Sequence, residues 1–284
     1  MSTVAATTPG AAPAGLKGVG EQVWRAASSS LGARLTAPAL FLVVWHFGSG
    51  FMDSILLPDP VSVFRKMWRF AVDGMVVEQF TISISRLLTG FFFVVVVGTV
   101  VGVAMGIFKH VDAYFNDILV VGITFPNIIW ALLLTMWIGY GSGAPIWVVM
   151  VAATPYIATN VSTGVKDVSK ELLDMARSYQ VSRGTILRHL VLPSLGPYFF
   201  AALRYALSTG WKGMIVGEVF ASQSGAGWFL TDIRRHADAA GIVAWGLYFG
   251  IFAIIVERLI FQRLAKRAFR WRPVESGRSA EAAT

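Results

Sequence analysis

The stretch ISRLLTGFFFVVVVGTVVGVAMGIF, at residues 84–108, contains almost only apolar residues. A helix of about 20 such residues covers the hydrocarbon core of a bilayer, so this stretch predicts a membrane-spanning helix. Gly98, Gly102 and Gly106 recur at every fourth position and therefore lie along one stripe of that helix. Such a stripe lets a second helix approach closely, although glycine is also simply common in membrane helices. We expect a close helix–helix contact along it.

Five further apolar stretches extend this interpretation to a protein with six membrane spans. The 284-residue chain is 55% hydrophobic and only 14% charged, with a mean hydropathy of +0.63. Soluble domains usually carry about 25% charged residues. We therefore predict an all-α integral membrane fold. The other predicted spans lie at residues 37–57, 118–140, 146–165, 198–220 and 242–261.

The positive charges predict how these spans are oriented. Six spans place both ends of the chain on one side of the membrane, and Lys and Arg concentrate in cytoplasmic loops. With the N-terminus inside, fifteen Lys and Arg residues fall on the cytoplasmic side, and five fall outside: Arg65, Lys66, Arg69, Arg234 and Arg235. The first three of these belong to an amphipathic segment that suits the outer headgroup region. Both termini are therefore predicted to be cytoplasmic.

This orientation divides the chain into three parts. We predict a cytoplasmic N-terminal tail at residues 1–35, a six-span domain at residues 36–265 and a basic cytoplasmic tail at residues 266–284. The formal net charge of +8 comes from these loops and tails. We therefore expect the basic residues to contact membrane lipid, and we expect no nucleic-acid partner.

Several classes of chemistry are absent from the sequence. The chain has no cysteine, which excludes disulfides and zinc–thiolate sites, and its four histidines are scattered. It contains no GxxxxGK[ST] phosphate loop and no GxSxG motif. We therefore expect no enzymatic activity, no metal and no cofactor in this chain.

A charged island at residues 166–196 interrupts the apolar spans on the predicted cytoplasmic side. Ser169 can cap one helix, whose first turn carries Glu171, and Ser182 can cap a second. Pro193 and Pro197 flank the start of the next span. The island is thus predicted to form two short helices joined by a turn. It could pack against its own bundle, but the amount of amphipathic surface favours a docking surface for another protein.

The island resembles the EAA loop of binding-protein-dependent ABC importer permeases. The pattern in that family is EAA, three residues, Gly, nine residues and then I-x-L-P. Asp174, Met175 and Ala176 stand at the EAA positions, Gln180 at the glycine, and LVLP at residues 190–193. Asp174, Met175 and Gln180 differ from the Glu, Ala and Gly that the pattern has at these positions. The resemblance implies ATPase-coupling roles for Glu171, Asp174, Met175, Ala176, Gln180, Leu190, Leu192 and Pro193.

The departure at Gln180 affects the predicted turn. A left-handed backbone costs a residue other than glycine about 1–2 kcal/mol. Either Gln180 tolerates this conformation or the turn is built differently.

Three other segments resemble the nitrate, sulfonate and taurine subgroup of these permeases. They are LLPDPVSVF at residues 56–64, GWKGMIVGEVF at residues 210–220 and GAGWFL at residues 225–230. The resemblance implies a type I importer permease in the bacterial inner membrane. Its partners would be two ATP-binding cassette ATPases, a substrate-binding protein and a second permease copy, which we expect to be a second copy of this chain. ATP would be used by the ATPases, and the cargo would be a small anion moved by alternating access.

Polar residues within the predicted spans are candidates for the substrate pathway. We predict that Lys212 faces the pathway and favours an anion; a structural ion pair with another span is the alternative. Arg204, near the cytoplasmic end, can instead extend its side chain to the interface. The predicted pathway residues are Lys212, Glu218, Ser208 and Asn127, with Asn160 and Thr209 as weaker candidates.

Two other functional classes remain as alternatives. A stand-alone secondary transporter or channel would use the island as an internal gate, and repeated halves, which the sequence does not display, would favour it. An intramembrane enzyme would need a nucleophile–base or metal pattern, and the sequence has neither.

Overall fold

The structure, a computed structural model, describes residues 30–261 and 263. The chain divides into two compact units, residues 1–64 and 65–284. The predicted C-terminal tail at residues 266–284 lies outside the described residues. So does most of the predicted N-terminal tail, because the first described helix, α2, begins at Ser30.

The first unit contains α2 (Ser30–Ser49) and the loop that follows it. The Trp45 indole donates a hydrogen bond to the Pro58 carbonyl at 3.0 Å, which ties this loop back to the helix. The predicted span at residues 37–57 is therefore wrong in its extent, because the helix ends at Ser49. Its apolar part, Thr36–Ser49, is shorter than the roughly 20 residues that cross a bilayer. α3 (Pro60–Val72) crosses the boundary between the units.

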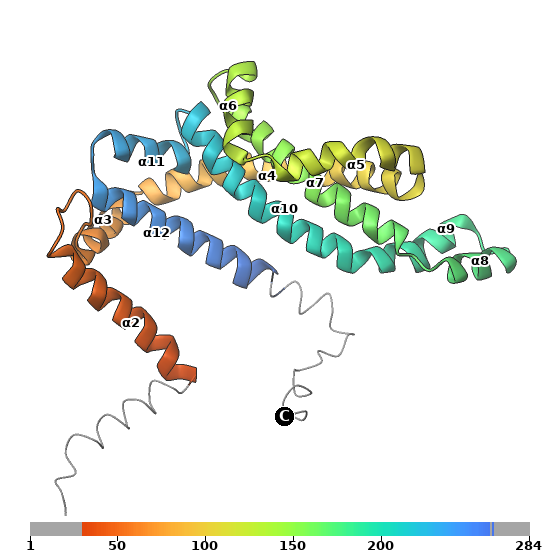
Figure 1. Ribbon diagram of the computed structural model, residues 1–284, viewed down its shortest axis with the longest axis horizontal. Coiled ribbons are helices and arrows are strands. Elements are labelled where there is room, and N and C mark those ends of the chain that lie inside the picture. Colours follow the sequence, from red (N-terminus) through yellow and green to blue (C-terminus); the bar gives the residue numbers. More distant parts are fainter. Residues whose placement is uncertain (1–29, 262, 264–284) are drawn as a thin grey trace, which may run out of the picture. The chain divides into compact units, whose positions relative to one another are not determined.

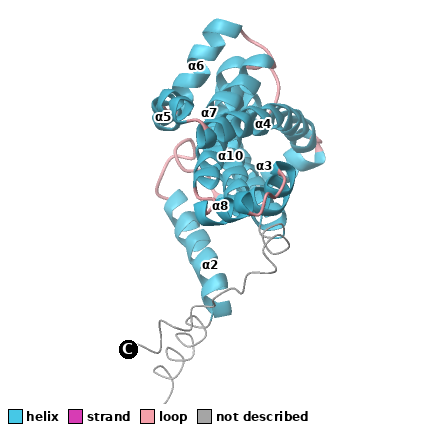
Figure 2. Ribbon diagram, turned by 90° about the vertical axis from the view of Figure 1, so that its right-hand side faces the viewer, coloured by secondary structure: helices cyan, strands magenta, loops and turns pink. Residues whose placement is uncertain are grey.

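The helices of the second unit, joined by short loops, are the regular secondary structure of its described residues (Figure 1). Three long helices, α4, α7 and α10, lie side by side, and the short helices α8 and α9 lie at one end of them (Figures 1 and 2). The remaining bounds are α4 (Met75–Ile107), α5 (Lys109–Thr124), α6 (Asn127–Ile138), α7 (Gly143–Lys166), α8 (Lys170–Ser178), α9 (Arg183–Ile186), the π-helix η1 (Leu187–Val191), α10 (Leu192–Ala221), α11 (Ala226–Arg235), α12 (Ala239–Ile255) and the π-helix η2 (Val256–Phe261).

The predicted glycine stripe is the contact between α4 and α7. A Cβ added at Gly98 would lie 2.6 Å from the Ile157 Cβ, and one at Gly102 would lie 2.6 Å from the Ala158 carbonyl oxygen. A Cβ at Gly106 would overlap with Val165. Real Cβ atoms do not approach so closely, so glycine is required where these backbones meet. The prediction of close helix packing is confirmed.

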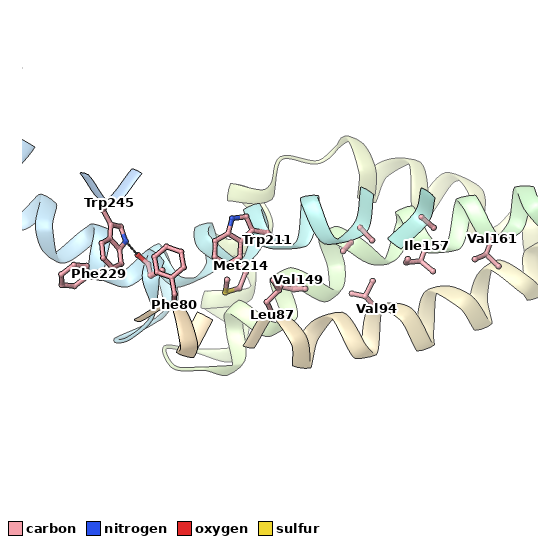
Figure 3. Close-up of a cluster of buried hydrophobic side chains, with 14 of the residues drawn as sticks. Phe80, Leu87, Val94, Val149, Ile157, Val161, Trp211, Met214, Phe229 and Trp245 are labelled. Atoms are coloured by element: carbon pink, nitrogen blue, oxygen red, sulfur yellow. Dashed lines mark hydrogen bonds between the residues drawn. The ribbon is translucent and has the colours of Figure 1, made fainter. Parts of the chain in front are cut away.

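The interior of the three-helix core is apolar along its length (Figure 3). Val94 on α4 packs with Val149 and Ile157 on α7, and Met214 reaches the same core from α10. At the end that carries α11, this core becomes aromatic: Phe80, Trp211 and Trp245 join it, together with Phe229. The core therefore fixes α4, α7 and α10 against each other and holds α11 and α12 at one end.

The predicted count of six spans is not confirmed. Four helices within the described residues are long and apolar enough to cross a membrane, and five segments qualify if a bent pair counts as one. That pair corrects the third predicted span, residues 118–140, which is not one helix: α5 and α6 meet at 103°. Pro126 explains the break, because a residue before proline avoids the helical region, and Phe125 is extended with ψ 127°.

Candidate functional site

The exposed helix α8 begins where the sequence places a cap. The Ser169 hydroxyl accepts a hydrogen bond from the Leu172 N–H at 3.3 Å, which satisfies a backbone donor of the first turn. The same hydroxyl donates to the Glu171 carboxylate at 2.7 Å. This hydrogen bond lowers the pKa of Glu171, so the carboxylate stays charged at the N-terminus of the helix. The predicted cap is confirmed.

Gln180 ends α8 in the conformation that glycine usually adopts. Its φ angle is 54°, in the left-handed region. The Gln180 N–H donates to the Arg177 carbonyl at 2.9 Å, and the Val181 N–H donates to the Ala176 carbonyl at 3.0 Å. These two bonds form a Schellman motif, which satisfies carbonyls at the helix end. Gln180 thus tolerates the left-handed turn, and the alternative of a turn built differently is wrong.

The second predicted helix of the island is correct at its start and wrong at its end. Ser182 caps α9 by accepting from the Thr185 N–H at 3.3 Å. However, α9 does not stop; it passes through η1 into α10, so that one continuous helix of 39 residues runs from Arg183 to Ala221. Pro193 follows the π-turns of η1 and donates no backbone hydrogen bond, yet the helix continues through it. The helix that begins at α9 is therefore continuous with α10.

The loop formed by α8 and α9 leaves its side chains uncovered. No residue of either helix is buried, and exposure reaches 44% for Leu172, 53% for Met175 and 78% for Tyr179. Asp174 is also exposed, and its carboxylate pairs with one described residue, Arg177, at 3.5 Å. The described residues therefore do not pack this loop against its own bundle. Of the other predicted coupling residues, Ala176 and Leu190 are half-buried, whereas Leu192 and Pro193 are exposed.

At the other end of the core, Glu218 lies in a buried polar network. Its side chain is fully buried and pairs with the Arg86 guanidinium at 2.8 Å. The Ser83 hydroxyl donates to the second carboxylate oxygen at 2.7 Å, and the Gly227 N–H donates to that same oxygen at 2.9 Å. A buried charge is tolerated when it is paired and hydrogen-bonded in this way. Glu218 thus has structural partners from α4 and α11, and it does not line the pocket described below.

The same network holds the loop between α10 and α11. Arg86 donates to the Ser224 carbonyl at 2.7 Å, and the Gln79 side chain accepts from the Gly225 N–H at 2.8 Å. The Trp245 indole donates to the Ala226 carbonyl at 2.8 Å (Figure 3). The loop is therefore fixed to α4 and α12 through its own backbone groups.

Sequence analysis missed Arg86, although a signal was present. Arg86 lies inside the predicted span at residues 84–108, where an ionisable side chain indicates a buried partner or a functional site. The same criterion, applied to ionisable residues within the later predicted spans, identified Glu218. Applied to Arg86 as well, it would have marked Arg86 as a candidate without identifying its partner.

Two of the predicted pathway residues, Ser208 and Lys212, line one pocket. The pocket has a volume of about 220 Å³ and lies between α10 and the C-terminal part of α12 with η2. Both side chains are exposed, and Lys212 forms no ion pair within the described residues. Arg204 lines the same pocket and pairs with Glu257 of η2, so it does not simply extend to the interface. The alternative of a structural ion pair thus applies to Arg204 and not to Lys212.

The remaining predicted pathway residues lie elsewhere. Asn127 is half-buried at the start of α6, with its amide nitrogen near Gly213 of α10. Asn160 donates to the Tyr156 carbonyl of its own helix at 2.8 Å. Thr209 is half-buried on α10. The structure therefore groups Lys212 with Ser208 and separates both from Asn127 and Glu218.

Comparisons with known proteins identify the family of the chain. Residues 94–271 match the family model described as "Binding-protein-dependent transport system inner membrane component". The putative aliphatic sulfonates transport permease protein SsuC of Bacillus subtilis is 23% identical over 84% of this chain and 87% of its own length. The taurine transport system permease protein TauC of Escherichia coli is 25% identical over 82% of this chain and 87% of its own.

Two further similarities concern a nitrate import permease and a solved structure. The nitrate import permease protein NrtB of Synechococcus elongatus is 24% identical over 78% of this chain and 84% of its own length. A chain from inward-facing conformations of the MetNI methionine ABC transporter superposes with a TM-score of 0.54, at 19% identity, over 66% of this chain and 93% of that chain. At this identity the structural likeness concerns the fold alone.

Proposed function

The chain belongs to the family of binding-protein-dependent transport system inner membrane components, in the nitrate, sulfonate and taurine subgroup of ABC importer permeases, and we propose that it imports a small anion by ATP-driven alternating access. As a permease component it is not itself an enzyme. In the proposal, two separate ATPase subunits supply the energy, and a substrate-binding protein delivers the anion from outside. A second copy of this chain completes the pathway.

The observation that carries the coupling part of this proposal is the uncovered loop of α8 and α9. Leu172, Met175 and Tyr179 expose apolar surface next to charged side chains, which is the composition of a protein-binding helix. Because α9 is continuous with α10, an ATPase that moves the loop would also move a long helix of the core. In this proposal the loop and both chain termini are cytoplasmic, as the distribution of Lys and Arg favours.

Two lines of support favour a small anion as the cargo. The similar permeases are named for aliphatic sulfonates, taurine and nitrate, and a further one, CmpB of Synechococcus elongatus, for bicarbonate. Within this chain, Lys212 offers an exposed positive charge beside the Ser208 hydroxyl. An ionisable residue at such a position in a membrane helix usually faces a pathway or a partner.

The proposal is tested by purification and uptake. An ATPase subunit encoded with this chain is expected to co-purify with it, and deletion of residues 171–190 is expected to abolish the association. In proteoliposomes that also contain the binding protein, uptake of nitrate, taurine or an alkanesulfonate should require ATP. Uptake that proceeds at the same rate without ATP and without the ATPase would favour the stand-alone transporter instead.

The role of Lys212 is tested in the same system. Lys212→Ala is expected to reduce uptake at least about tenfold, since a binding site that loses its charged donor commonly loses 1.5–3 kcal/mol. Arg235→Ala, which removes an exposed positive charge on α11, is the matched control and should have little effect. Normal uptake by Lys212→Ala would remove Lys212 from the pathway.

A further inference from the structure

The pocket beside Lys212 is lined by more positive than negative charges. Of the residues that line it, three are ionisable: Arg204 and Lys212 on α10 and Glu257 on η2. Two positive charges and one negative charge leave one net positive charge. Arg204 and Glu257 neutralise each other in an ion pair, with the Arg204 Nε also 3.2 Å from a Glu257 oxygen. The uncompensated charge is therefore that of Lys212.

The geometry of α10 places the polar groups of the pocket in one row. Arg204, Ser208 and Lys212 are separated by four residues each, so they lie on the same face of the helix, and the backbone positions of the two cationic residues are about 12 Å apart along its axis. The Ser208 hydroxyl stands between them. One anion could thus contact Lys212 and Ser208 while Arg204 remains bound to Glu257.

Apolar side chains form the rest of the pocket. The rings of Trp211 and Phe252 stack with centroids 4.1 Å apart, and Leu87 adds a contact from α4. Charge interactions are stronger next to such low-dielectric walls than in open water. A volume of about 220 Å³ admits an ion of a few heavy atoms together with water.

We infer that this pocket binds a singly charged anion on the translocation pathway, and that Glu257 determines this preference by neutralising Arg204. The inference rests on the proposed function and adds the charge of the substrate and a specificity-determining residue. An anion with two negative charges would retain one uncompensated charge in the pocket, which is costly in apolar surroundings. The Glu257 carboxylate would also repel it.

Loss of the Glu257 charge should change the preference. In Glu257→Gln the pocket carries two positive charges, and the Arg204 guanidinium is free to bind an oxyanion with two parallel hydrogen bonds. This variant is therefore expected to accept a doubly charged anion such as sulfate, whereas Lys212→Gln should lose affinity for all anions.

The absence of cysteine from the chain allows a direct test. Ser208→Cys introduces a single thiol into the pocket, and Ser178→Cys, on exposed α8, provides a control thiol. The full chain, purified in detergent with any subunits that accompany it, is treated with 2-sulfonatoethyl and 2-(trimethylammonium)ethyl methanethiosulfonate. The ratio of the two modification rates reports the local potential, because the reactivity of the thiol itself cancels in the ratio.

We expect the negatively charged reagent to be favoured at Ser208→Cys relative to Ser178→Cys. Adding Lys212→Gln should lower the ratio at Ser208→Cys at least about threefold, and adding Glu257→Gln should raise it by a similar factor, while neither changes the ratio at Ser178→Cys. Ala253→Cys, on the α12 side of the pocket, should respond in the same direction.

The charge preference of the pocket is then measured by how strongly an added anion protects the thiol from a neutral reagent, methyl methanethiosulfonate. Methanesulfonate should slow modification of Ser208→Cys, whereas sulfate should do so only after Glu257→Gln. Thiols that cannot be modified at either position, or sulfate protection that is independent of Glu257, would overturn the inference. These measurements need no transport, so their failure can be distinguished from a failure of ATP-dependent uptake, which would overturn the proposed function.

Discussion

The two ends of the helical core differ in whether the described residues cover their side chains. At the end that carries α11, Glu218 and Arg86 are buried and hydrogen-bonded to each other and to the neighbouring loop. At the opposite end, α8 has no buried residue and exposes apolar side chains such as Met175. Within the described residues, the first region is covered by its own neighbours, whereas nothing covers the second. Substitutions at the first end should therefore affect stability, and those at the second should affect association.

The largest effect is expected from Glu218→Gln. The substitution leaves the Arg86 guanidinium buried without its counter-charge, and removal of one member of a buried ion pair commonly costs about 3–5 kcal/mol. We expect a correspondingly lower free energy of unfolding of the purified protein in detergent. Asp73→Asn, at an exposed position between α3 and α4, is the control and should change stability by less than about 0.5 kcal/mol. Equal stability of the two variants would contradict the distinction between the two ends.

In contrast to Glu218→Gln, Met175→Glu should weaken association and leave stability unchanged. A charge on the exposed apolar face of α8 is expected to weaken binding of the ATPase partner at least about tenfold, with the free energy of unfolding unchanged. Affinity is measured by titration of the detergent-solubilised chain with the purified ATPase. Met52→Glu changes another exposed methionine, in the loop after α2, and should bind normally. If Met175→Glu bound as tightly as the unchanged chain, α8 would not be the docking surface.

Gln180→Gly should stabilise α8 by up to about 1 kcal/mol, because glycine adopts the left-handed turn without the steric cost that Gln180 bears. Slower hydrogen exchange of the α8 amides would report this gain. Uptake should be retained, since the turn keeps its shape. Complete loss of uptake in a folded Gln180→Gly protein would contradict our interpretation of this turn.

The smallest effect is expected at a partly exposed ion pair between α3 and α12. Lys66 donates to Asp238 at 2.5 Å, while the Gly241 N–H is capped by the same carboxylate. Burial alone would raise the pKa of Asp238, but the Lys66 and Gly241 hydrogen bonds outweigh it, and the pKa is lowered.

A lowered carboxylate pKa contributes stability above the pKa of the unfolded chain and loses it as pH falls through the folded value. Asp238→Asn keeps a capping side chain and removes only the charge, so we expect a loss below about 1 kcal/mol at neutral pH. Unfolding of both proteins measured from pH 7 to pH 3 should show this difference shrinking in acid. A difference that is independent of pH would contradict the role given to the charge.

Local patterns in the sequence predicted the exposed end well. Ser169 and Ser182 act through backbone groups within a few residues, so their capping roles follow from spacing alone. The turn at Gln180 was implied by the resemblance to the EAA loop. The glycine stripe was likewise readable, although its partner helix α7 was not, because nothing in residues 84–108 specifies which helix will pack there. The subgroup of anion importer permeases is also confirmed, since the motifs that indicate it occupy short contiguous segments.

The sequence was less informative where residues distant in the chain meet. The pairing of Arg86 with Glu218 joins positions 132 residues apart, and the pairing of Arg204 with Glu257 joins positions 53 apart. Neither ion pair can be predicted from the helical periodicity of the sequence. The hydropathy of residues 118–140 also concealed the bend at Pro126, because the residues on both sides of the proline are equally apolar. Long-range pairs and helix breaks within apolar sequence therefore required the structure.

The most direct test of the whole account is anion uptake by reconstituted vesicles in which the composition is varied. We predict that uptake requires this chain, its ATPase partner, the binding protein and ATP together, and that Met175→Glu abolishes it while the protein remains folded. Uptake at an undiminished rate by vesicles that contain only this chain, without nucleotide, would contradict the conclusion that α8 receives the driving subunit.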